Sequence, residues 1–186
     1  AFLSGNISFN GDSEASVMNL GSINADEFAA LIGGHVENAG SIISEGGSVG
    51  LLAAETTFEI GEASGGVISL DISGLLGGSA TQDGLIDVSS ENGDGGKVLL
   101  KASDSVSATG SSSTLANAGD LGSGGEIIFF SENTATWEPN SVISAQGGKT
   151  AGDGGFVELS GLLDVKLSGS HVSTTASMGE TGDFLI

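Results

Sequence analysis

The chain has 186 residues, enough for one domain with a sizeable core, and its 33 glycines follow no Gly-X-Y period, which excludes collagen. It has 24 acidic residues, four lysines and no arginine, which gives a net charge of −20. Nucleic acid is therefore a poor partner, because binding to it needs basic residues at the phosphates. The lack of cysteine excludes disulfides and thiolate zinc sites, and no apolar run approaches the roughly 20 residues that span a bilayer.

Residues 1–16 alternate apolar and small polar residues around Phe2, Ile7 and Phe9, which predicts a strand and then a turn at Asn10-Gly11. A repeat follows. Val17-Met18-Asn19-Leu20-Gly21-Ser22-Ile23 returns 19 residues later as Val36-Glu37-Asn38-Ala39-Gly40-Ser41-Ile42, with five positions identical. The chain starts and stops inside such patterns without a secretion signal at Ala1, so we expect a mature protein or a segment of a longer one.

A second repeat organises the remaining chain. It reads Gly-Asp-Gly-Gly followed by an alternating strand, at residues 93–100 and again at 152–159. Related units begin at Asp26, Gly46, Gly65, Gly95, Gly124, Gly154 and Gly182, with spacings of 20, 19, 30, 29, 30 and 28. The fourth residue of each unit is apolar (Ala29, Val49, Ile68, Val98, Ile127, Val157 and Leu185), and so is the sixth where it is present. This pattern predicts one strand with a buried face in every coil.

Short strands, glycine turns and a period of 20–30 residues without a helical segment are typical of a solenoid. We therefore predict an all-β fold, a parallel β-helix whose coils rise about 4.8 Å each. It forms a single domain over residues 1–186, with coils of about 20 residues in 1–64 and of about 30 residues in 65–186. The glycines of each unit are expected to allow a tight corner.

Six stretches of this chain resemble filamentous-haemagglutinin-type exoproteins, the large adhesins of bacterial two-partner secretion. Residues 2–9, 19–25, 36–42 and 46–54 are similar to the later part of the secretion domain, and residues 154–161 and 182–186 to the repeats that follow it. The resemblance implies a right-handed β-helix, export through an outer-membrane secretion pore, and an adhesive role at the bacterial surface or in secreted form. The family's upstream Asn-Pro-Asn motif is absent, and the sole proline is Pro139.

Asp94 and Asp153, the acids before the Gly-Gly pairs, are candidate calcium ligands, because calcium prefers several oxygen ligands. In the column of this position they alternate with Ser123, so they are expected two coils and roughly 10 Å apart. That separation is too wide for one ion to contact both. A hydrogen-bonding role in the turn is the favoured interpretation, and no cofactor is required.

Asn19, Asn38 and Asn117 lie in similar Asn-containing turns, which predicts a ladder of stacked side-chain amides.

His35 and His171 fit no catalytic or metal-binding spacing and are expected at the surface or in turns. Trp137 is the candidate partner contact, since a loop aromatic can stack on a sugar or a protein. The alternative is that its ring covers the edge of the core.

These observations favour a non-enzymatic, extracellular structural and adhesive module with a cell-surface or glycan receptor. An alternative is a filament subunit that stacks end to end on copies of itself, because the chain ends on an open strand pattern at residues 184–186. A carbohydrate-active β-helix enzyme is disfavoured, because such sites cluster acids with a basic partner and this chain has four lysines and no arginine.

Overall fold

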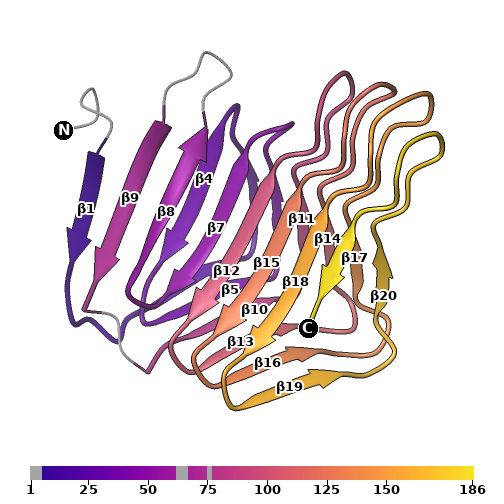
Figure 1. Ribbon diagram of the computed structural model, residues 1–186. Coiled ribbons are helices and arrows are strands. Elements are labelled where there is room, and N and C mark those ends of the chain that lie inside the picture. The colour runs from indigo at the N-terminus through magenta and orange to yellow at the C-terminus, as the bar shows by residue number, and fades with distance from the viewer. Residues whose placement is uncertain (1–5, 62–66, 75–76) are drawn as a thin grey trace.

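The computed structural model describes residues 6–61, 67–74 and 77–186, and every regular element in these ranges is a β-strand (Figure 1). This part of the chain therefore has no helix that could cross a membrane. The described strands form three six-stranded parallel sheets and one three-stranded sheet. Phe2, in the first predicted strand, lies outside the described residues, as do Gly65 and Gly66.

The three large sheets are the walls of the solenoid. The first sheet contains β2 (Ser16–Asn19), β5 (His35–Asn38), β10 (Ser79–Gln82), β13 (Ser105–Ala108), β16 (Thr134–Trp137) and β19 (Asp164–Leu167). The second contains β3 (Ser22–Asn24), β6 (Ser41–Ile43), β11 (Leu85–Asp87), β14 (Ser113–Leu115), β17 (Val142–Ser144) and β20 (His171–Ser173). The third contains β4 (Phe28–Ile32), β7 (Ser48–Ala53), β12 (Lys97–Ala102), β15 (Glu126–Ser131), β18 (Phe156–Gly161) and β21 (Asp183–Leu185).

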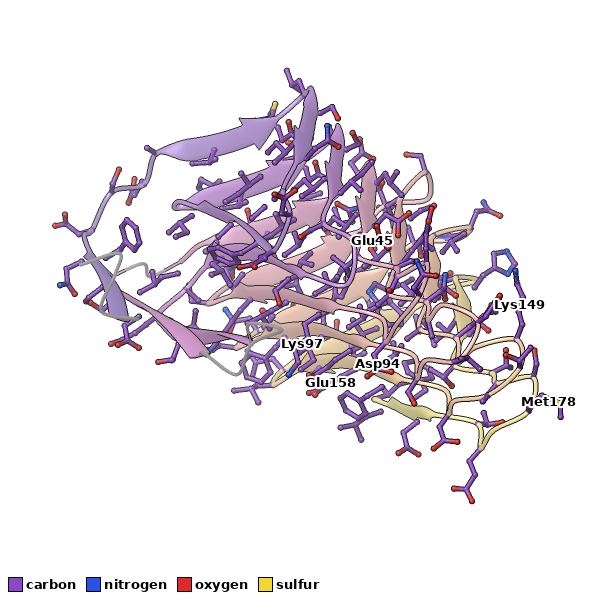
Figure 2. The ribbon with its side chains drawn as sticks, turned by 90° about the horizontal axis from the view of Figure 1, so that it is seen from above. Glu45, Asp94, Lys97, Lys149, Glu158 and Met178 are labelled. Atoms are coloured by element: carbon purple, nitrogen blue, oxygen red, sulfur yellow. The ribbon has the colours of Figure 1, made fainter. Side chains whose placement is uncertain are left out.

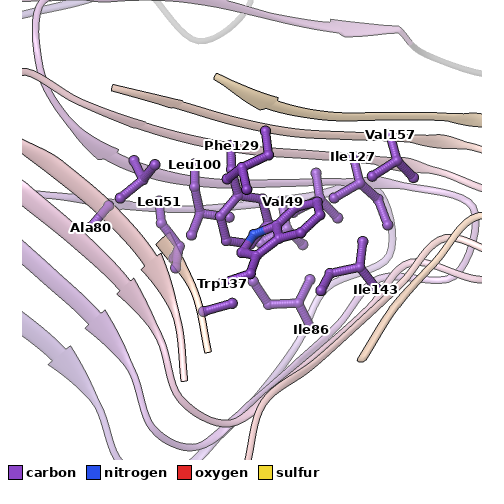
Figure 3. Close-up of a cluster of buried hydrophobic side chains, with 14 of the residues drawn as sticks. Val49, Leu51, Ala80, Ile86, Leu100, Ile127, Phe129, Trp137, Ile143 and Val157 are labelled. Atoms are coloured by element: carbon purple, nitrogen blue, oxygen red, sulfur yellow. The ribbon is translucent and has the colours of Figure 1, made fainter. Parts of the chain in front are cut away.

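One strand from each sheet, in chain order, makes one coil, and each strand pairs in parallel with its counterpart in the next coil. The predicted parallel β-helix is confirmed. Side chains alternate inward and outward along each strand, so the predicted core positions on β7, β12, β15 and β18 are 2% exposed or less. These positions are Val49, Leu51, Val98, Leu100, Ile127, Phe129, Val157 and Leu159. Figure 3 shows Val49, Leu100 and Ile127 among the core side chains. Ala29 and Leu31, the predicted core positions on the end strand β4, are only partly buried.

The later coils are longer mainly because of one loop, the connection from the second sheet to the third. It covers residues 25–27 and 44–47 in the first two coils, and residues 88–96, 116–125, 145–155 and 174–182 in the last four. These four long loops lie side by side at the upper right of Figure 1, and we call them the loop ridge. The predicted change from short to long coils therefore lies mostly at this corner of the solenoid. The connection from the first sheet to the second adds a smaller part, since it covers residues 20–21 and 39–40 in the first two coils and residues 109–112 and 138–141 in two later ones.

The prediction of a coil beginning at Gly65 is wrong. Strand β12 pairs directly with β7, Lys97 beside Ser48, so no strand of the third sheet lies between them. Strands β8 (Thr56–Gly61) and β9 (Val67–Ser73) instead form an antiparallel hairpin, and β1 (Asn6–Asn10) pairs with β9 in parallel. A hairpin strand after a glycine pair has the same alternating pattern as a coil strand, so the sequence pattern alone does not separate them.

This three-stranded side sheet covers part of the outer face of the third sheet. Ile72 of β9 and Leu52 of β7 are 3% and 0% exposed and form a second, small cluster. Phe28, Ile32 and Leu99 pack against that cluster from β4 and β12. All of β7 is consequently buried on both faces, which explains why its sequence is apolar or small throughout.

The register of the last coil also differs from the prediction. Phe156 pairs with Asp183 and Val157 with Phe184, so Phe184 faces the core and Leu185 faces outward. Only one glycine remains in the last unit. Gly182 follows Gly155 rather than Gly154 in the stack, since a Cβ built at Gly182 would lie 1.9 Å from the Gly155 carbonyl oxygen.

In the last coils the glycine pairs serve close stacking rather than the predicted tight bend. Gly46, in the pair at 46–47, has a positive φ of 61°, as a tight bend requires, whereas neither glycine of the pairs at 95–96, 124–125 and 154–155 has a positive φ. A Cβ at Gly96, Gly125 or Gly155 would lie 2.1 Å or less from the carbonyl oxygen of the equivalent residue one coil earlier. Any side chain at these positions would push the coils apart.

Candidate functional site

The acidic column beside the glycine pairs makes hydrogen bonds from coil to coil. Asp94 Oδ1 accepts from the Ser123 amide at 2.8 Å, and Ser123 Oγ accepts from the Asp153 amide at 3.2 Å. Asp153 Oδ1 in turn accepts from the Glu180 amide at 2.8 Å. Each side chain thus satisfies a backbone N–H in the next loop of the ridge. This arrangement is the turn role that the sequence favoured for these acids.

Metal-binding residues do not gather around these two acids in the described part of the chain. No group of three or more His, Asp or Glu side chains there is placed to hold an ion. Asp94 lies at the corner of the coil in Figure 2, with Glu45 farther along the same side. Glu45 Oε1 accepts from the Glu91 amide at 3.0 Å, so this carboxylate also contacts backbone.

The predicted amide ladder is present inside the first three coils. Asn19 Nδ2 donates to Asn38 Oδ1 at 2.7 Å, and Asn38 Nδ2 donates to Gln82 Oε1 at 2.8 Å. Gln82 Nε2 ends the ladder by donating to the carbonyl oxygens of Gly84 and Ser113. Asn38 and Gln82 are fully buried, so these bonds replace water that the amides lose on folding.

Gln82 takes the place in this ladder that the sequence suggested for Asn117. The residue four positions later distinguishes the two: it is isoleucine after Asn19, Asn38 and Gln82 and leucine after Asn117, although a glycine follows all four at the second position. Asn117 instead lies in the loop ridge, where its Oδ1 accepts from Ser144 Oγ at 2.7 Å and from the Gln146 amide at 2.9 Å.

The two histidines lie at the surface, as predicted. His35 Nδ1 is 2.9 Å from Ser79 Oγ of the neighbouring coil, and both His35 and His171 are exposed. Each lies at the first position of a strand, β5 and β20 respectively, so they belong to different sheets.

Trp137 is a core residue and is not displayed in a surface loop. Its side chain is 0% exposed, and the ring of Phe129 lies edge-on at a centroid distance of 5.4 Å (Figure 3). The ring of Phe184 is stacked on the indole at 5.7 Å. The counterpart of Trp137 one coil earlier is Ala108, whose small side chain leaves room for the indole. The suggested partner contact is therefore corrected: a buried ring has no surface to offer, and the core-edge alternative describes its position.

The outer face of the third sheet beyond the side sheet forms a flat array of side chains, which we call the lateral face. It consists of Lys97, Leu99 and Lys101 on β12, Glu126, Ile128 and Phe130 on β15, and Phe156, Glu158 and Ser160 on β18. Lys97 and Glu126 form an ion pair at 3.2 Å, and Lys101 Nζ lies 5.4 Å from the centre of the Phe130 ring. The face thus combines aliphatic, aromatic and balanced charged groups.

A shallow groove of about 390 Å³ follows the glycine pairs along one edge of this face. Glycine backbone forms its floor, and the side chains of Lys97, Glu126, Phe156 and Asp183 line it. These groups can donate and accept hydrogen bonds and can stack on a flat ligand.

The architecture is a parallel β-solenoid whose described surface offers loops and a flat face. The Trp137 ring and the amide ladder of Asn19, Asn38 and Gln82 lie inside the solenoid. No family model, curated protein or solved structure matches the chain. The strand topology supports the parallel β-solenoid that the resemblance to filamentous-haemagglutinin-type exoproteins implies. Because none of these comparisons matches, membership of that family stays a prediction from the residues quoted above.

Proposed function

We propose that this chain is a non-enzymatic structural and adhesive β-solenoid module of a secreted or surface-exposed bacterial exoprotein. The observation that carries the proposal is the stack of six coils, whose interior is filled and whose long loops line up on one side. Such a solenoid presents an extended surface with little conformational freedom to a large partner. Export through an outer-membrane pore belongs to the same proposal and is supported by the sequence resemblance.

The loop ridge is the surface proposed to contact a cell-surface or glycan receptor. Its tips carry exposed apolar residues, Leu121 at 71% and Met178 at 73%, and the Lys149 side chain is 88% exposed. Lys149 and Met178 lie at the outer edge of the molecule in Figure 2. Exposed apolar tips on a rigid support are typical of contact residues, because their burial on binding stabilises a complex without reordering the support.

The test is binding of purified protein to epithelial cells and to an immobilised glycan panel. We expect saturable binding that the double change Leu121→Ser and Met178→Ser weakens, and no release of reducing sugar from any bound glycan. Leu20→Ser is the matched control, because Leu20 is 74% exposed but lies in the first coil away from the ridge. Absence of saturable binding to both surfaces would refute the adhesive role.

A filament subunit that stacks end to end is the second candidate, and the open ends of the sheets favour it. Strands β2, β3 and β4 stand last at one end of the three sheets, and β19, β20 and β21 at the other. In the last coil Val165 and Val172 are only partly buried, and Phe184 is 39% exposed. Edge strands with apolar neighbours invite pairing with another chain.

Electron microscopy of the purified protein over a range of concentrations tests this candidate. Axial stacking predicts rods whose length grows with concentration while their width stays that of one solenoid. Val172→Glu should stop that growth, because it places a charge at the end of the core. Dispersed short particles at every concentration would eliminate the filament.

A further inference from the structure

We propose that the lateral face is a self-association surface on which a second copy of this chain docks face to face. The proposal concerns the sides of the solenoid and does not depend on the adhesive role of the loop ridge. It rests on the charge, the apolar centre and the neighbourhood of this face.

Charge singles out the lateral face on an otherwise strongly acidic protein. It carries Lys97 and Lys101, half of the four lysines in the chain, and two acids, Glu126 and Glu158. The chain as a whole bears −20 charges, so most surfaces of two copies repel each other. A charge-balanced face is where two copies can approach closely, since the like-charge penalty is smallest there.

The centre of the lateral face is apolar. Leu99, Ile128, Phe130 and Phe156 are all only partly buried and lie on three adjacent strands. Lys101 lies over the Phe130 ring, and neither Lys101 nor Glu158 forms an ion pair among the described residues. An apolar centre with charged groups around it is the usual anatomy of a protein interface.

Part of the outer face of the third sheet is already covered within one copy. On β4 and β7 the side sheet packs against it, with Ile72 in contact with the cluster around Leu52. Leu99 belongs to that cluster and also to the lateral face, so the apolar surface continues past the side sheet onto β15. The outer face of the third sheet is therefore already shown to pack against a second layer of strands.

A second copy fits this face because the face is complementary to itself. In a two-fold arrangement the same patch meets itself, and charged groups that form no ion pair within one copy can pair across the interface. Within one copy Glu158 accepts a hydrogen bond from Ser160 Oγ, which leaves its charge unneutralised. Lys101 of one copy can then meet Glu158 of the other, while Ile128 and Phe130 meet at the centre.

Sedimentation velocity over a wide concentration range, at low and high sodium chloride, tests the proposal. We expect a monomer–dimer equilibrium that added salt strengthens, because salt screens repulsion between two highly acidic bodies. Phe130→Glu should weaken dimerisation about tenfold or more. Thr136→Glu is the matched control, because it adds the same charge in the adjacent coil but on the outer face of the first sheet.

A charge exchange provides the second measurement, and circular dichroism verifies the fold of each variant. Lys101→Glu alone should weaken the dimer, and combining it with Glu158→Lys should restore it. A monomer under all conditions, equal effects of Phe130→Glu and Thr136→Glu, or no rescue by the combined change would overturn the proposal. Loss of association through Val172→Glu, with Phe130→Glu silent, would assign it to the coil ends instead.

Discussion

Gly125 shows how closely neighbouring coils approach at the glycine corner. A Cβ there would lie 2.0 Å from the Gly96 carbonyl oxygen, and backbone atoms cannot move aside as a flexible side chain can. Gly125→Ala should therefore lower the free energy of unfolding by about 1–3 kcal/mol, as overpacking does in well-packed cores. Chemical denaturation monitored by circular dichroism measures this change.

Gly21→Ala is the control for that prediction. The nearest atom to a Cβ at Gly21 is Asn19 Oδ1 at 4.0 Å, and Gly21 has no positive φ. The change should alter the free energy of unfolding by no more than about 0.5 kcal/mol. Equal effects at Gly21 and Gly125 would show that the coils do not depend on the corner contact.

Trp137, the single tryptophan, reports on the interior of the later coils. Because its ring is buried between Phe129 and Phe184, we expect blue-shifted fluorescence and strong protection from iodide. Denaturant should abolish both properties together. Emission typical of a water-exposed indole in the native protein would contradict the buried position and return Trp137 to the candidates for partner contact.

The side sheet is the element whose stability should be separable from that of the coils. Its contact with the solenoid depends on the small cluster of Ile72 and Leu52, whereas the coils share a much larger continuous core. Ile72→Ala should therefore speed hydrogen exchange in β8 and β9 while exchange in β15 and β18 stays slow. It should cost about 2–5 kcal/mol of local stability.

Ile86→Ala is the matched change within the main core, where Ile86 of β11 is 0% exposed. It should raise exchange across several coils, because each coil is stabilised by its neighbours. If Ile72→Ala accelerated exchange in every strand equally, the side sheet and the coils would be one cooperative unit.

The strands and the core positions could be predicted from the sequence because each coil repeats the same alternation. Val98, Ile127 and Val157 follow a glycine pair at a constant offset, and all three are buried. The side sheet could not be predicted, because the strand after Gly66 has the same local pattern as these strands and differs only in its partners, β1 and β8. Long-range pairing decides between a coil and a hairpin, and local sequence does not contain it.

The candidate contacts were harder to place than the fold. Trp137 stands beside Pro139 in a stretch that reads as a loop, yet it lies two residues after Ala135, which is also buried. Its neighbours Phe129 and Phe184 come from other strands, so its burial follows from the stacking of coils. Gln82 entered the amide ladder for the same reason, since it stacks on Asn38 although 44 residues separate them.

At the scale of the whole molecule, repulsion among the acids should limit stability. The charge of −20 is opposed by ion pairs of three lysines among the described residues, at Lys97, Lys149 and Lys166, and each pair is exposed at the surface. Added salt should therefore raise the thermal midpoint, because screening weakens repulsion more than it weakens these few pairs. A gain of 1 kcal/mol corresponds to about 2–4 °C in a domain of this size.

Differential scanning fluorimetry in sodium, potassium and calcium chlorides at equal ionic strength measures this effect. Sodium and potassium should act alike, because screening depends on ionic strength. A larger shift with calcium would identify ion binding, with Asp94 and Asp153 as the first residues to change. A midpoint that falls with sodium chloride would contradict the dominance of repulsion.

Glu27 makes the two ends of the solenoid different at the glycine corner. Because Phe28 pairs with Ser48, Glu27 holds in the first coil the corner position that Gly47, Gly96, Gly125, Gly155 and Gly182 hold in the coils that follow. At each of those glycines a Cβ would lie 2.5 Å or less from an oxygen of the preceding coil. A second copy that continued the stack in register beyond Gly182 would place the Cβ of Glu27 against that glycine's carbonyl. The first coil of a second copy is thus a poor extension of the stack, and we expect identical copies to meet more readily along their sides than at their ends.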